Sequence, residues 1–137
     1  MRTIIAVITV LTVIYLSGCV SSKTGIQNAD LGGTEWVMFE MNGNKYEAAD
    51  KVTIKFDDAG KKISGKAPCN NYGAGATVIS NKVSFSELFS TKMMCDNIND
   101  EQTFFDTIKK VYAYQTANDM LYFFDSGGMV ILRFKTK

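Results

Sequence analysis

The chain has 137 residues, of which 46% are hydrophobic, and its formal net charge is +1. This length and composition predict one domain with a single core, and the balanced charge offers no basic footprint for a nucleic-acid partner. Histidine is absent, which excludes a Ser-His-Asp or Cys-His nucleophile.

Residues 1–18 have the pattern of a secretory leader. Met1-Arg2 is a positive start, and residues 3–15 are an apolar stretch, too short for a bilayer span of about 20 residues. The leader ends in Leu16-Ser17-Gly18-Cys19, which matches the bacterial lipobox. Cleavage there makes Cys19 the acylated first residue of the mature chain. The alternative is a buried N-terminal strand or helix with an incidental cysteine.

Residues 19–33 are small and polar with no apolar period, as in a flexible tether. No Asp follows Cys19, which favours the outer membrane over the inner one. We therefore expect a protein anchored in the bacterial envelope by lipid, without a transmembrane helix and otherwise soluble. Its folded domain is expected over residues 34–137.

Short apolar runs separated by turn signals predict an antiparallel sheet from Thr34 onward. Asn42-Gly43 is a hairpin signal, and residues 57–60 form a second turn. The acids of that second turn, Asp57 and Asp58, are interpreted as a solvated loop rather than a metal or catalytic pair. The first three strands are expected at residues 34–40, 45–48 and 52–56, and residues 62–66 lead into the segment described next.

The segment Ser64 to Gly75 holds the only proline of the chain, together with a cysteine, two asparagines and three glycines. Proline fixes its own φ, and glycine permits conformations or close approaches that a Cβ forbids. The segment is therefore predicted to be a shaped corner, neither ordinary strand nor helix, with Cys69 at its centre.

One helix is predicted near residues 100–111. Asn99 or Asp100 can cap it, with Gln102 completing a capping box. Apolar side chains recur on one face at helical spacing, which indicates a core-facing surface rather than an aromatic ligand box. The remaining strands are expected at residues 76–79, 82–85, 111–115, 120–124 and 129–135.

Cys69 and Cys95 are the two cysteines left when Cys19 is acylated. In an oxidising compartment they form a disulfide or stay as two buried thiols, and spacing alone does not decide between these. A bridge would close a loop of about 27 residues and contribute about 3.5 kcal/mol by loop-closure entropy. We expect no catalytic residues, cofactor or metal ligands.

Several stretches together resemble the META domain of bacterial heat-shock-associated lipoproteins, over about residues 33–134. The most specific are Cys69-Asn70-Asn71-Tyr72-Gly73 and Thr91-Lys92-Met93-Met94-Cys95. The chain differs from that pattern at Pro68 and Met94. The other matching stretches surround Trp36, residues 52–56, Ser64-Gly65, Glu101, Phe104-Phe105, residues 121–123 and 131–134.

The resemblance implies an α+β fold, in which a curved antiparallel sheet or conical barrel of about seven or eight short strands wraps around one helix. Its outline is similar to that of secretin pilotins. The family is linked to envelope stress, heat shock and tolerance of some antibiotics, and no catalytic residue set accompanies it.

The leading hypothesis is a non-enzymatic envelope lipoprotein that binds a protein or another envelope component. The expected surface lies near Asn70, Asn71, Tyr72 and Met93, beside the loop of residues 86–94. The first alternative is a carrier holding a lipid or drug between helix and sheet. The second is a hydrolase or redox enzyme using Cys69 or Cys95, which would require a reactive thiol.

Overall fold

The computed structural model describes residues 31–47, 52–96 and 98–137. The predicted leader, Cys19 and all but the last three residues of the predicted tether lie outside this range, as does Ala48 at the end of the predicted second strand. The elements are β1 Glu35–Met41, β2 Asn44–Lys45, β3 Thr53–Phe56, β4 Lys62–Lys66, β5 Asn71–Ile79, β6 Lys82–Phe85, β7 Phe89–Ser90, α1 Ile98–Ile108, β8 Ala113–Ala117, β9 Met120–Phe124 and β10 Val130–Thr136.

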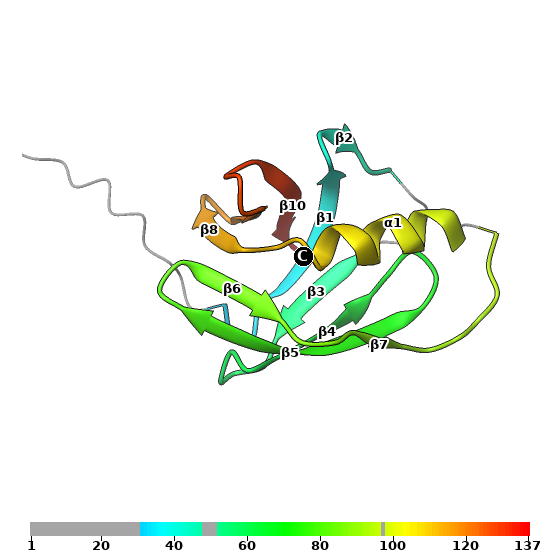
Figure 1. Ribbon diagram of the computed structural model, residues 1–137, viewed down its shortest axis with the longest axis horizontal. Coiled ribbons are helices and arrows are strands. Elements are labelled where there is room, and N and C mark those ends of the chain that lie inside the picture. Colours follow the sequence, from blue (N-terminus) through cyan, green and yellow to red (C-terminus); the bar gives the residue numbers. More distant parts are fainter. Residues whose placement is uncertain (1–30, 48–51, 97) are drawn as a thin grey trace, which may run out of the picture.

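Eight of these strands form a closed antiparallel barrel. Hydrogen-bonded neighbours follow the order β10-β9-β8-β6-β5-β4-β3-β1, and β10 pairs with β1 to close the ring (Figure 1). The short strands β2 and β7 pair with β1 and β5 at the margin. The predicted α+β fold is confirmed, and the choice between curved sheet and barrel is settled in favour of the barrel.

Closure joins the first and last strands of the barrel. Trp36 is paired with Thr136, and Met41 with Leu132. Ion pairs link Glu40 of β1 to Arg133 of β10, and Glu35 of β1 to Lys137, which directly follows β10.

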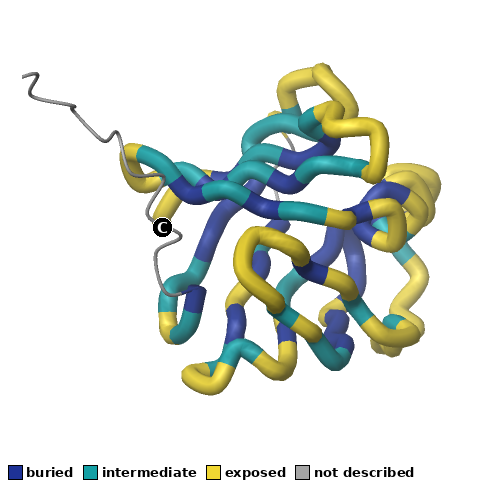
Figure 2. The backbone as a smooth tube through the Cα atoms, turned by 60° about the vertical axis from the view of Figure 1, so that its left-hand side comes forward, coloured by how far each residue is buried: buried dark blue, intermediate teal, exposed yellow. Residues whose placement is uncertain are grey.

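The barrel interior is filled by aromatic and branched side chains. Strand residues alternate between this core and the exterior, whereas turns carry most of the exposed positions (Figure 2). Phe123 makes edge contacts with Phe85 and Phe134, at centroid distances of 5.9 and 5.7 Å. The largest fully buried side chains are Phe56, Phe104, Phe123, Phe134, Ile54, Ile108, Leu121 and Leu132.

The helix α1 lies close to the predicted position and buries its apolar face. Phe104 and Ile108 are fully buried in the core. The predicted capping box is wrong, because the helix begins at Ile98 and Asn99 is already helical. The side chain of Gln102 instead donates to Asp106 within the helix. Among the described residues, no helix has both the length and the apolar character needed to cross a membrane.

The prediction that residues 64–75 avoid regular structure is also wrong. Residues up to 66 belong to β4 and those from 71 onward to β5, so only residues 67–70 form the turn. The glycines serve close packing between strands, and none of them has a positive φ. A Cβ on Gly65 would overlap the carbonyl oxygen of Thr53, and one on Gly73 would lie 2.5 Å from the ring of Phe89.

Candidate functional site

The turn between β4 and β5, residues 67–70, is buried. Ala67 and Pro68 are fully buried, and Cys69 and Asn70 are exposed by 4% and 2%. A backbone bond from the N–H of Ala67 to the carbonyl of Asn70, 2.8 Å long, closes the turn. Burial of a turn leaves backbone N–H groups that need partners, because an unpaired buried donor is costly.

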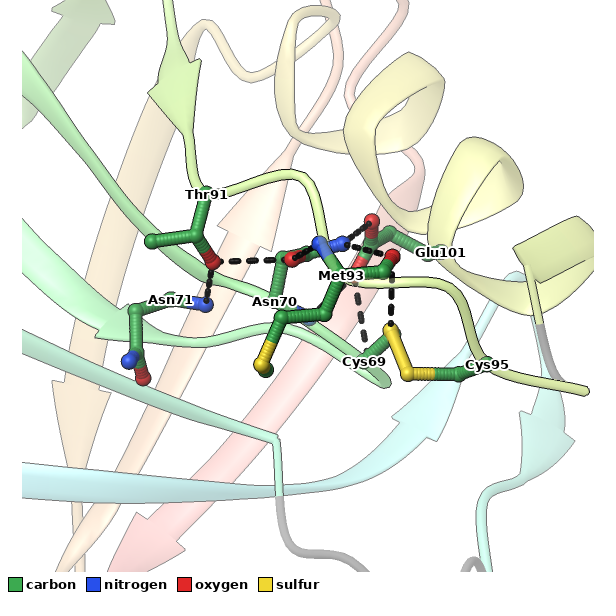
Figure 3. The surroundings of a disulfide bond; sticks show 7 residues. All are labelled: Cys69, Asn70, Asn71, Thr91, Met93, Cys95 and Glu101. Atoms are coloured by element: carbon green, nitrogen blue, oxygen red, sulfur yellow. Dashed lines mark hydrogen bonds between the residues drawn. A yellow bond between two sulfur atoms is a disulfide. The ribbon is translucent and has the colours of Figure 1, made fainter.

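Glu101 in the first turns of α1 supplies those partners. Its Oε2 accepts from the backbone N–H groups of Cys69, at 3.0 Å, and Asn70, at 2.6 Å. Its Oε1 accepts from Asn70 Nδ2 at 2.7 Å. Glu101 is itself buried, so its carboxylate and the three donors satisfy one another away from water. The helix is thereby fixed to the turn (Figure 3).

The side chain of Asn70 ties the turn to a third segment, the loop after β7. Asn70 Oδ1 accepts from Thr91 Oγ1 at 2.8 Å and from the N–H of Met93 at 2.7 Å. Thr91 Oγ1 also accepts from the N–H of Asn71, at 3.2 Å. An amide is suited to this position because it carries both donors and acceptors. These hydrogen bonds hold residues 91–93 against the turn, in the way that hydrogen bonds from a neighbouring strand would.

A disulfide joins Cys69 to Cys95, with the Cα atoms 6.0 Å apart (Figure 3). The loop between β7 and α1 is therefore secured at two points, by Asn70 near its start and by the disulfide near its end. Three segments meet here: the β4–β5 turn, this loop and the start of the helix.

The structure divides the predicted interaction residues into two groups. Asn71 and Met93 are exposed, whereas Asn70 and Tyr72 are buried, so their predicted place on a surface is wrong. The side-chain oxygen and nitrogen of Asn70 are both engaged in the hydrogen bonds described above. Tyr72 points into the core because β5 places it inward, against the rings of Phe104 and Phe105 at centroid distances of 5.3 and 5.9 Å.

The hydroxyl of Tyr72 donates to the carbonyl oxygen of Thr53 at 2.9 Å. Burial raises the pKa of Tyr72 above its ordinary value of 10.0, because an apolar surrounding disfavours the phenolate. Tyr72 is thus a structural residue of the barrel.

The exposed surface over this frame is apolar, and the sequence analysis placed Met93 on it but not Met94 or Ile98. Met94 is fully exposed, Met93 is 53% exposed and Ile98 is 49% exposed. They border a groove of about 330 Å³ between the loop and the helix, with Phe105 and Gln102 on its helix side. We call Met93, Met94 and Ile98 the methionine surface. Two adjacent methionines before a cysteine were the only sequence signal, and they do not reveal exposure.

The described residues contain no candidate metal site. Within the described ranges, no three acidic or cysteine side chains gather closely enough to hold a metal ion.

The comparisons with known proteins identify the family. The META domain model matches residues 29–137, which is most of the chain, so the protein belongs to the META domain family. No match was found among curated proteins.

Three solved structures are similar in fold. An NMR structure of a protein from Burkholderia xenovorans is 19% identical, with a TM-score of 0.62, and the alignment covers 78% of this chain and 83% of that one. A second NMR structure is 22% identical, with a TM-score of 0.59 and coverage of 77% and 90%. A crystal structure of a DUF4847 family protein from Bacteroides vulgatus is 10% identical, with a TM-score of 0.56 and coverage of 77% and 93%.

Proposed function

We propose that this META domain protein is a lipid-anchored, non-enzymatic protein of the bacterial envelope that binds a protein partner through its methionine surface. The observation that supports binding is the exposure of three neighbouring apolar side chains, Met93, Met94 and Ile98. Contiguous exposed apolar side chains commonly mark interaction sites. Methionine is frequent on such sites because its unbranched, polarisable side chain adapts to the partner.

The frame beneath this surface supports the same proposal. The backbone of Met93 is bound by Asn70, and the disulfide of Cys95 follows directly after Met94. A loop held in place before binding loses less conformational freedom when the partner arrives. The frame therefore lowers the ordering cost of association while leaving the side chains free to adapt.

The anchor is supported by the leader pattern and by the cysteine at its end. A tether of about 15 residues would have a mean end-to-end distance of about 20 Å as a flexible coil. The methionine surface would then work close to the membrane that carries Cys19. A role in envelope stress or antibiotic tolerance, with placement in the outer membrane, completes the proposal.

The two alternatives have less support. A carrier site between helix and sheet would need space there, whereas the rings of Tyr72, Phe104 and Phe105 pack against one another at that place. A cysteine nucleophile needs a free thiolate, and both candidate sulfurs are engaged in the disulfide.

The binding proposal is tested by site-specific photocrosslinking in intact cells. A photoreactive residue replaces Met94, and in the control it replaces Met129, which is 69% exposed but borders no part of the methionine surface. We expect a discrete adduct from position 94 and none of the same mass from position 129. The adduct's partner, identified by mass spectrometry and purified, should bind the wild type more tightly than Met94→Asp by about tenfold or more.

Equal adducts from both positions, or a purified partner whose affinity is unchanged by Met94→Asp, would contradict the proposed surface. The anchor has its own test, which is the incorporation of labelled fatty acid and the membrane fractionation of wild type and Cys19→Ser. An unlabelled wild type would refute lipidation without touching the binding proposal.

A further inference from the structure

A second groove, which shares no lining residue with the methionine surface, lies where β6 meets β8. This junction is the narrowest pairing in the barrel, with Lys82 opposite Ala113 as its one registered pair. Two further backbone bonds hold it, from the N–H of Val83 to the carbonyl of Tyr112 and from the N–H of Tyr114 to the carbonyl of Asn81. The strand β8 continues beyond the β5–β6 turn, so one edge of β8 faces this turn, whereas its other edge is paired with β9 along its whole length.

The groove has a simple construction. Its floor is the outward face of β8, on which Ala113 and Gln115 alternate with the buried Tyr114. One wall is the β5–β6 turn with Ser80 and Asn81, and the other is the β9–β10 turn of residues 125–128. The small side chain of Ala113 leaves the depression, which has a volume of about 560 Å³.

The volume is within the range of about 300–1,000 Å³ that is typical of small-molecule sites. Two aromatic side chains border the depression around Ala113. Phe124 is paired with Ala113 on the neighbouring strand, and Tyr112 precedes it with 46% of its surface exposed. The ring of Tyr112 is held by the ammonium group of Lys82, which lies 5.1 Å from the ring centroid.

The remaining lining groups are hydroxyls, amides and one carboxylate. Ser80, Asn81, Gln115 and Ser126 contribute neutral groups, and Asp125 contributes the carboxylate. Amide and hydroxyl side chains both donate and accept hydrogen bonds. Asp125 is already oriented, because its Oδ1 accepts from the N–H groups of residues 127 and 129, each at 2.9 Å.

One residue of the wall has an unusual backbone. Ser80 has a φ of 56°, a left-handed conformation that costs a serine more than a glycine or asparagine. Strain of this kind is retained where the surrounding structure needs it, and binding sites are common among such places. Here the turn brings Asn81 against β8, where its carbonyl accepts from Tyr114.

The combination of aromatic rings, neutral hydrogen-bonding groups and one carboxylate in the lining favours some classes of ligand over others. No lysine or arginine is among the lining residues and a carboxylate is. The ammonium group of Lys82 lies outside the lining, against the ring of Tyr112, so the lining itself gives phosphates and other anions no cationic partner. A purely apolar ligand would strip water from the lining amides and hydroxyls without replacing it, at about 1–3 kcal/mol for each unpaired group. A sugar ring satisfies both halves of the lining, because its C–H faces pack on aromatic rings and its hydroxyls both donate and accept.

From this lining, we propose that the groove, which we call the seam groove, binds an uncharged saccharide. A sugar unit lies over Ala113 with its apolar face against Tyr112 and Phe124. Its hydroxyls bond to the amides of Asn81 and Gln115 and to the carboxylate of Asp125. This proposal is independent of the protein partner proposed above, since the two sites have no residue in common.

The test is an NMR titration of the full chain in detergent micelles with N,N′-diacetylchitobiose and with cellobiose. Saturable shifts are expected for the backbone amides of residues 112–115 and 125–128. The matched variants are Ala113→Trp, which fills the floor of the groove, and Ala117→Trp, which adds the same bulk farther along the outward face of β8. The first should weaken binding by about tenfold or more, and the second by less than about twofold.

Gln115→Leu keeps the size of the side chain and removes its hydrogen bonds, so it should also weaken binding severalfold while the spectrum stays folded. Three outcomes overturn the proposal: neither disaccharide shifts the groove amides, binding survives Ala113→Trp in a folded variant, or inorganic phosphate produces the same shifts. A Met94→Asp control should bind saccharide as the wild type does, which separates failure of this site from failure of the methionine surface.

Discussion

Removal of the Glu101 carboxylate should cause one of the largest losses of stability available to a single polar substitution in this chain. In Glu101→Ala the two backbone N–H groups of Cys69 and Asn70 lose their acceptor in a buried place, and Asn70 Nδ2 keeps only its longer bond to the carbonyl oxygen of Met93, at 3.4 Å. Each unsatisfied buried donor costs about 1–3 kcal/mol. With partial relief by entering water, we expect the free energy of unfolding to fall by about 4 kcal/mol, out of a typical total of about 5–15 kcal/mol.

The assay is urea unfolding without reductant, followed by the fluorescence of Trp36, the only tryptophan and 4% exposed. For an m-value of about 1.5 kcal/mol/M, the midpoint should fall by about 2.7 M. The neighbouring exposed residue provides the control, because Gln102→Ala removes only a bond within the helix to Asp106, worth about 0.5 kcal/mol or less. A loss below about 1 kcal/mol in Glu101→Ala would refute the reasoning, because water or rearrangement would then replace the carboxylate at little cost.

Three further predictions concern the same region. Gly65→Ala should lower the free energy of unfolding by about 3 kcal/mol because the new methyl meets a backbone carbonyl of β3. Gly73→Ala should lower it by only about 1 kcal/mol, because the closest contact is the exposed ring of Phe89, which can turn away, and the carbonyl oxygen of Ile63 lies 3.2 Å off. Equal losses in urea unfolding would contradict this. Cys69→Ala/Cys95→Ala should lower the free energy of unfolding by about 3 kcal/mol, and an unchanged midpoint would show that the disulfide adds no stability. The folded-state pKa of Tyr72 is raised above 10.0. The stability that its neutral phenol contributes is therefore fully present below about pH 10 and falls as the pH rises further. Tyr72→Phe should lose stability less steeply than the wild type at alkaline pH, and parallel pH profiles of the two proteins would rule this out.

Local signals in the sequence predicted the local parts of the fold. Asn42-Gly43 forms the expected turn, and Asn118-Asp119 forms another in the gap between two predicted strands; all four of these residues have positive φ. Alternation over residues 52–56 correctly predicted a strand, although β3 itself begins at Thr53. Closure of the barrel was not derivable from the residues, since the pairing of Trp36 with Thr136 depends on the accumulated twist and stagger of all the strands between them.

The candidate site was predicted only in outline. The corner and the following loop were recognised as neighbours, but the burial of Asn70 depends on Glu101, which lies 31 residues away in the sequence. Asparagine is usually exposed, so only the tertiary partner explains its position inside. The same limitation concealed Ala113, whose small side chain leaves a groove only because two turns rise beside it.

Pairing of the first strand with the last sets a condition on how the barrel completes its folding. The ring cannot close without β10, which spans Val130–Thr136, because β10 is the partner of β1. Contacts so distant along the chain form late, after a large loss of chain entropy. Until β10 is available to pair with β1, the barrel therefore stays open along that edge, and the two edge strands keep unpaired backbone groups.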